Sequence, residues 1–185
     1  MPFVSAKPLE NYPWYVRVLF WKQRRIFGCV LDPSLYWARS PRVFVAFALV
    51  YAALERRSSP LSPALRSLVM VRVSQIVRCA FCTDVNSAIL AKRGVSEERI
   101  SSLADWRRTD LFTPEERLAL EYAEATTLDK VDDDLRRRLK ARWSDDALVE
   151  LTGLIAFQNL SAKFNSALDG LLRASAGSRN DSNLE

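Results

Sequence analysis

The sequence motif CAFC places Cys79 and Cys82 three residues apart, directly after Arg78. At this spacing on a helix, two thiols lie close enough to cycle between a dithiol and a disulfide. The dipole at a helix N-terminus lowers the pKa of a nearby thiol, and the thiolate is the reactive form. These residues therefore favour a redox-capable pair. The alternative that they leave open is two small apolar side chains in a core, because free cysteine is often buried.

Other kinds of site are excluded by composition. The chain contains no histidine, so Ser-His-Asp catalysis, Cys-His catalysis and histidine zinc ligands are ruled out. A structural zinc site at the motif would need two more ligands, and Cys29 is the one other cysteine. Three cysteines are also too few for a secreted disulfide scaffold. We therefore expect no metal site, and we assign Cys29 no role.

The elements that must position the pair are predicted to be helices. The 185 residues, 49% hydrophobic and 26% charged, are typical of one globular domain. A capping residue precedes proline at Asp32, Ser40, Ser62 and Thr113, and Ser96 and Ser144 are further helix starts. Apolar residues recur at helical spacing between these starts. The expected fold is all-α, with helices near 12–28, 41–56, 63–76, 80–93, 97–106, 114–127, 132–142 and 145–172.

The charge pattern is uneven along the chain. Residues 14–57 hold eight Lys or Arg and two acidic residues, a net charge of +6 against +5 for the whole chain. Such a stripe could bind nucleic acid or an anionic membrane, but a solvated helix face is the more common outcome. No nucleic-acid-binding motif accompanies it, so no nucleic-acid partner is expected. The N-terminal segment with Trp14 and Trp21 is expected to pack in the core or across a neighbouring subunit.

Targeting signals are not evident in the sequence. The N-terminus lacks a charged region followed by an apolar core. The longest apolar run, Val43–Leu54, has 12 residues, well short of the ~20 that a membrane-spanning helix requires. A cytoplasmic protein without a membrane span is therefore expected.

Three consecutive stretches around the motif resemble one known family. They read LRSLVMVRVSQIVRCAFCTDVNSAILAKRGVSEERI, LFTPEERLALEYAEATT and WSDDALVELTGLIAFQNLSAKFNSAL. This pattern is similar to the carboxymuconolactone decarboxylase / alkylhydroperoxidase D family, from about Pro41 to Leu168. The resemblance implies an all-α fold with a redox helix hairpin, no bound metal or flavin cofactor, and assembly into trimers or hexamers. We expect a single domain with an N-terminal helical arm (1–40), a family core (41–173) and, because its residues are small and polar, a disordered tail (174–185).

The resemblance further implies roles for individual residues. The second cysteine of the family's motif is the peroxidatic thiol, which corresponds to Cys82, and the first, which resolves the sulfenic acid, corresponds to Cys79. An external dithiol then reduces the disulfide. The family also has a histidine four residues after the second cysteine and a glutamate about a dozen residues before the first. In this sequence those positions are Asn86 and Ser67.

The two replacements weaken the expected chemistry. A relay histidine contributes roughly 10²–10⁴-fold by general acid–base catalysis, and Asn86 cannot change its protonation near neutral pH. Thiolate formation at Cys82 would depend on the helix N-terminus and a cation such as Arg78 or Arg72. The leading hypothesis is a weak thiol-dependent hydroperoxide reductase. The alternatives are a non-catalytic binding or assembly member of the family, and a decarboxylase-like enzyme that holds a small cyclic acid by Arg72 or Arg78.

Overall fold

The computed structural model describes residues 4–168, and within this range every regular element is a helix. The prediction of an all-α fold is confirmed. The described residues divide into two compact units, one formed by residues 4–53 and 165–168 and the other by residues 54–164. The predicted tail, 174–185, and the last predicted helical residues, 169–172, lie outside the described residues.

The first unit is a small helical cluster held together by aromatic side chains. Its elements are η1 (Leu9–Asn11), α1 (Trp14–Phe27), α2 (Asp32–Trp37) and most of α3 (Pro41–Leu54). The ring of Phe20 lies 5.2 Å from that of Tyr12 and 5.8 Å from that of Phe44. Gln23 ties α1 to α2, because its side chain donates to Ser34 at 2.6 Å. These contacts give the unit its own buried centre.

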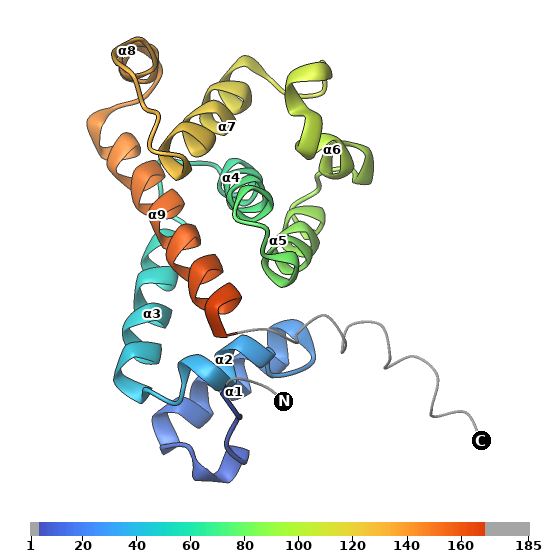
Figure 1. Cartoon of the computed structure of the whole chain (residues 1–185), viewed down its shortest axis with the longest axis vertical. Coiled ribbons are helices and arrows are strands. Elements are labelled where there is room, and N and C mark those ends of the chain that lie inside the picture. Colours follow the sequence, from blue (N-terminus) through green and yellow to red (C-terminus); the bar gives the residue numbers. More distant parts are fainter. Residues whose placement is uncertain (1–3, 169–185) are drawn as a thin grey trace, which may run out of the picture. The chain divides into compact units, whose positions relative to one another are not determined.

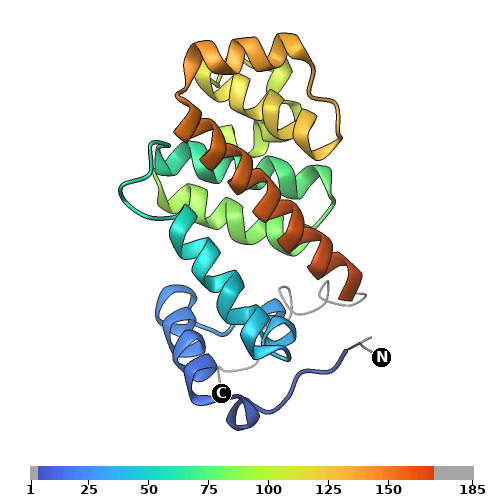
Figure 2. The same cartoon turned by 90° about the vertical axis from the view of Figure 1, so that its left-hand side faces the viewer.

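The second unit contains the cysteine motif. Its elements are α4 (Pro63–Ile76), α5 (Ala80–Lys92), α6 (Glu97–Ser101), η2 (Ser102–Arg108), α7 (Pro114–Thr127), α8 (Asp133–Arg142) and most of α9 (Asp145–Leu168). Helix α4 lies between α5 and α7 (Figure 1). Helix α9 runs across α4 and α5 (Figure 2), where its Gln158 bonds to α4 and its Ala162 packs against the cysteines of α5. Three helices therefore converge on the motif.

The helix starts follow the predicted caps in most cases. The Ser62 hydroxyl accepts from the backbone N–H of Leu65 at 3.2 Å, and Thr113 forms a complete capping box with Glu116. Ser96 and Ser144 also accept bonds from their first turns. The predicted cap at Asp32 is wrong, since Asp32 is the first residue of α2 and Leu31 is the N-cap. The short helix α2 itself was not among the predicted helices.

One predicted helix, 97–106, is interrupted. Helix α6 ends at Ser101 and the chain continues as the 3₁₀ segment η2, in which Asp105 leaves helical geometry at φ −114°, ψ 32°. Tertiary contacts explain the break. Arg72 donates to the carbonyl of Ala104 at 3.2 Å, and the Trp106 indole donates to Glu124 at 2.8 Å. These long-range bonds compete with the helical pattern that local spacing predicts.

No helix in the range 4–168 combines the length and the apolar character needed to cross a bilayer. Helix α3, which holds the longest apolar run of the sequence, has 14 residues.

Candidate active site

Cys79 and Cys82 are joined by a disulfide at the start of α5, with their Cα atoms 5.3 Å apart. Cys79 is the N-cap of the helix, and its sulfur accepts a hydrogen bond from the backbone N–H of Cys82 at 3.3 Å. A sulfur therefore takes the place that a hydroxyl or carboxylate oxygen usually has at this position. An anion at the same position would face the positive end of the helix dipole.

The turn before the pair holds its backbone in a defined geometry. The N–H of Arg78 donates to the carbonyl of Gln75 at 3.1 Å, and the N–H of Cys79 donates to that of Ser74 at 3.0 Å. These two bonds form a Schellman motif at the end of α4. Arg78 has φ 56°, the left-handed conformation that glycine usually adopts there. Its side chain is exposed, so the cation lies at the surface next to the pair in sequence.

The sulfurs themselves lie in an apolar environment. Both cysteines are buried, with 5% of Cys79 and 4% of Cys82 exposed, and they pack against Val77, Phe81 and Ala162. The oxidised pair is therefore largely enclosed in the single chain.

A buried polar cluster lies one helical turn beyond the disulfide. Asn86 follows Cys82 by four residues on α5, and its Nδ2 donates to the Ser74 hydroxyl at 3.2 Å. Gln158 on α9 donates to the same hydroxyl at 2.9 Å. All three side chains are buried. We call Ser74, Asn86 and Gln158 the amide cluster.

Ser67, the position of the family's glutamate, is not part of this cluster. Its hydroxyl accepts from Arg93 at 2.8 Å, and it lies two helical turns before Ser74 on α4. Helices α4 and α5 run antiparallel, so that Ser74 meets Asn86 and Ser67 meets Arg93, farther from the cysteines. The structure therefore brings together Cys79, Cys82 and Asn86 but not Ser67.

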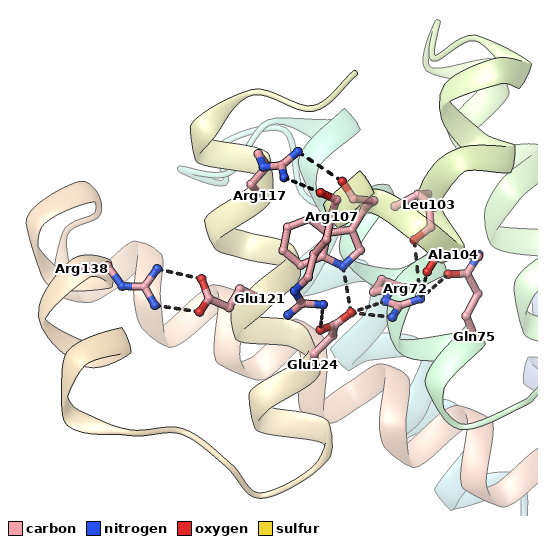
Figure 3. Close-up of polar contacts among 10 residues, drawn as sticks. Arg72, Gln75, Leu103, Ala104, Arg107, Arg117, Glu121, Glu124 and Arg138 are labelled. Atoms are coloured by element: carbon pink, nitrogen blue, oxygen red, sulfur yellow. Dashed lines mark hydrogen bonds and ion pairs between the residues drawn. The ribbon is translucent and has the colours of Figure 1, made fainter. Parts of the chain in front are cut away.

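Arg72 is occupied by a second network on the other side of α4 (Figure 3). Its Nε donates to Glu124 at 2.7 Å and its Nη1 to Gln75 at 3.1 Å. Glu124 also accepts from Trp106 and pairs with Arg107. Burial raises the pKa of Glu124, but the hydrogen bonds from Trp106, Arg107 and Arg72 outweigh it and hold the pKa below its ordinary value. Arg72 is thus neutralised by a carboxylate rather than turned toward the cysteine pair.

Sequence reasoning missed Ser74 and Gln158. Each had a usable signal, because each is a polar residue within an apolar stretch, VMVRVSQIV for Ser74 and LTGLIAFQNL for Gln158. A polar side chain at a core position needs a hydrogen-bond partner, so each of these two residues is a candidate for a buried polar contact, although the sequence does not name its partner.

The described residues thus combine an all-α core with a disulfide-bonded CxxC pair at the start of α5. Residues 41–125 match the Carboxymuconolactone decarboxylase family. The chain is also 48% identical over 168 residues to the uncharacterized protein YnjA of Escherichia coli (strain K12), covering 90% of this chain and 92% of that one. The protein belongs to the Carboxymuconolactone decarboxylase family.

Solved structures show the same fold. The alkylhydroperoxidase AhpD core of an uncharacterized peroxidase-related protein from Ralstonia eutropha JMP134 superposes with a TM-score of 0.82 at 20% identity, covering 90% of each chain. A protein of unknown function from Agrobacterium tumefaciens, described as a candidate antioxidant defence protein AhpD, is 28% identical with a TM-score of 0.68. That likeness covers 74% of this chain and 94% of the other. The predicted alkylhydroperoxidase D-like fold is therefore confirmed.

Proposed function

We propose that the protein is a thiol-dependent hydroperoxide reductase that uses Cys79 and Cys82 as its dithiol/disulfide pair. The observation that carries the proposal is the disulfide at the N-terminus of α5, where the helix dipole favours a thiolate. The peroxidase-related description of the Ralstonia relative, which has the same fold, adds support.

The proposed cycle conserves atoms and electrons. The Cys82 thiolate attacks the terminal oxygen of a hydroperoxide ROOH, so that an S–O bond forms, the O–O bond breaks and the alcohol ROH leaves with a proton. Cys82 is now a sulfenic acid. The Cys79 thiol attacks its sulfur, a disulfide forms and water leaves. An external dithiol then reduces the disulfide by exchange and becomes oxidised itself.

We expect this activity to be weak. Asn86 lies one turn from Cys82, where it can hold a hydrogen bond but cannot carry a proton. Ser67 is bonded to Arg93 and provides no acid. Proton transfer to the leaving alkoxide therefore falls to water or to the reacting thiols, without the roughly 10²–10⁴-fold that a positioned acid or base contributes.

A decarboxylase-like activity has less support from the geometry. Its substrate carboxylate would need a cation near the cysteines, and Arg72 is already bonded to Glu124. Arg78, next to the pair in sequence, has an exposed side chain. Loss of the binding of small cyclic acids in Arg78→Ala would favour that alternative, and the absence of such binding would remove it.

We also infer that the protein assembles into a homo-oligomer, a trimer or a hexamer. The first unit exposes large apolar side chains, with 74% of Trp14, 62% of Ile26 and 65% of Leu49 accessible in the single chain. Exposed apolar groups of this size indicate a surface that a partner covers. Light scattering coupled to size-exclusion chromatography measures the assembly, and a monomer at micromolar concentration would contradict it.

Thiol consumption by an organic hydroperoxide tests the main proposal. The exposed Cys29 is replaced by serine so that the thiols counted in the assay are those of Cys79 and Cys82. The reduced protein should lose two thiols for each cumene hydroperoxide converted to its alcohol. In Cys79→Ser the reaction should stop at a sulfenic acid that dimedone traps, and Cys82→Ser should not react. Unchanged thiols after prolonged exposure, in a protein whose pair dithiothreitol reduces, would refute the proposal. If Cys82→Ser retains the biological phenotype, the binding or assembly alternative is favoured.

A further inference from the structure

The amide cluster joins three helices through one hydroxyl group. Ser74 Oγ accepts from Asn86 Nδ2 at 3.2 Å and from Gln158 Nε2 at 2.9 Å, and it donates to the carbonyl of Met70 at 2.7 Å. A hydroxyl has one hydrogen and two lone pairs, so Ser74 is saturated. Ser74 is fully buried, and 2% of Gln158 and 7% of Asn86 are exposed. Burying three such groups costs free energy that an apolar core would avoid.

The position of the cluster relates it to Cys82. Asn86 lies four residues after Cys82 on α5, and side chains on a helix lean toward its N-terminus over the preceding turn. Gln158 lies four residues before Ala162 on α9, and Ala162 packs against both cysteines. Both helices therefore carry an amide one turn away from the disulfide, and Ser74 on α4 joins the two amides.

The hydrogen bonds leave Asn86 with an available donor. Its Nδ2 carries two hydrogens, and one of them is directed at Ser74. That bond restricts the orientation of the amide group. Gln158 occupies the second lone pair of Ser74, so the hydroxyl cannot turn away from Asn86 without losing a buried bond. The orientation of Asn86 is thus controlled from α9 through α4.

We propose that the amide cluster is the hydrogen-bonding half of the cysteine site: Asn86 donates its second N–H to the sulfur of reduced Cys82, and Gln158 is a positioning residue that acts through Ser74. The inference deepens the proposed function, because it names the groups that stabilise the thiolate in a chain without a proton relay. It depends only on the reduction of the pair, not on the identity of the oxidant. A neutral amide stabilises the thiolate without titrating itself. The reactivity of Cys82 should therefore show a single transition with pH, the ionisation of its own thiol.

Alkylation of Cys82 by iodoacetamide tests the inference. In a background of Cys29→Ser and Cys79→Ser, Cys82 is the single thiol, and serine is itself a good N-cap at 79. The rate of S-alkylation, in which an S–C bond forms and iodide leaves, is measured from about pH 5 to about pH 10 around the thiol range. Asn86→Ala and Gln158→Leu should each raise the midpoint of this profile by about one pH unit, which lowers the rate tenfold on the acid side.

A double variant separates positioning from a merely structural role. Because Gln158 acts through Asn86, adding Gln158→Leu to Asn86→Ala should shift the midpoint no further. Asn159→Leu is the matched control, since Asn159 is the next residue on α9 but bonds to Thr127 and should leave the midpoint unchanged. Ser74→Ala should reproduce the shift of Gln158→Leu, and it decides the question if Gln158→Leu does not melt cooperatively.

Two results would overturn the inference. The first is a folded Gln158→Leu or Ser74→Ala variant whose alkylation midpoint is unshifted. The second is a Gln158→Leu shift that is equally large whether residue 86 is asparagine or alanine. The alkylation needs no hydroperoxide, so the two tests are independent. The proposed role of the amide cluster can be refuted while hydroperoxide reduction is confirmed, and the reverse can also occur.

Discussion

Replacing Arg78 by glycine should stabilise the protein although it removes a charged side chain beside the active pair. Arg78 has φ 56° and an exposed side chain, so the substitution relieves the backbone without removing a packed group. The left-handed conformation costs a non-glycine residue about 1–2 kcal/mol. Glycine also has more conformational freedom in the unfolded chain, which lowers the free energy of unfolding by roughly 0.4–1 kcal/mol and offsets part of this gain. The net gain should be about 0.5–1 kcal/mol.

Urea denaturation of the disulfide form, followed by circular dichroism, measures this gain as a higher midpoint at an unchanged slope. Arg78→Lys keeps the backbone cost and should match the wild type. Asp129 provides the matched control, because it has φ 55° at the end of α7. The same pair of bonds is present there, since the N–H of Asp129 donates to the carbonyl of Thr126 and the N–H of Lys130 to that of Ala125. Aspartate tolerates this conformation better, so Asp129→Gly should gain less than about 0.5 kcal/mol. An Arg78→Gly variant no more stable than Arg78→Lys would refute the reasoning.

Two further predictions concern other groups of the second unit. Glu124→Gln should lower the free energy of unfolding by about 2 kcal/mol at pH 7, because Arg72 and Arg107 lose a charged acceptor. Since the folded protein holds the pKa of Glu124 below 4.5, the wild type has this contribution above that pH and loses it as pH falls through the lower folded value. The gap between the two urea curves should therefore shrink in acid, and a constant gap would contradict it. Asn86→His should raise the rate of thiol oxidation by cumene hydroperoxide by roughly 10²-fold at pH 7, whereas Asn86→Gln should not; equal rates in the two variants would show that proton transfer is not limiting.

Local chemistry explains why much of the fold was predictable. The bounds of α4 and α7 agree with the predicted 63–76 and 114–127, because Ser62-Pro63 and Thr113-Pro114 specify a helix start within a few residues. The place of the cysteines at the start of α5 follows in the same way from the chain just before them. Helix starts, stops and the i, i+3 spacing of a motif are all set by neighbours in sequence.

The partners of the site residues were less predictable. Gln158 and Ser74 are 84 residues apart, and Glu124 and Arg72 are 52 apart, so no local pattern indicates either contact. Arg72 illustrates the difficulty. Its position close to the cysteines in sequence suggested that its guanidinium would stabilise the thiolate. In the structure, its side chain bonds to Glu124 on α7 and to the carbonyl of Ala104 in η2 instead. Proximity along a helix does not specify a shared face, and only the packing of a third element decides it.

Because the backbone N–H of Cys82 donates to the sulfur of Cys79, the chemical shift of this amide proton should report the redox state of the pair. The acceptor is half of a disulfide in one state and a thiol or thiolate in the other, so the magnetic environment of that proton differs between them. Isotope-edited NMR could then follow each two-electron event in the molecule through a single resonance, with no dye and no coupled enzyme. The first turn of α5 would thereby supply its own reporter of turnover.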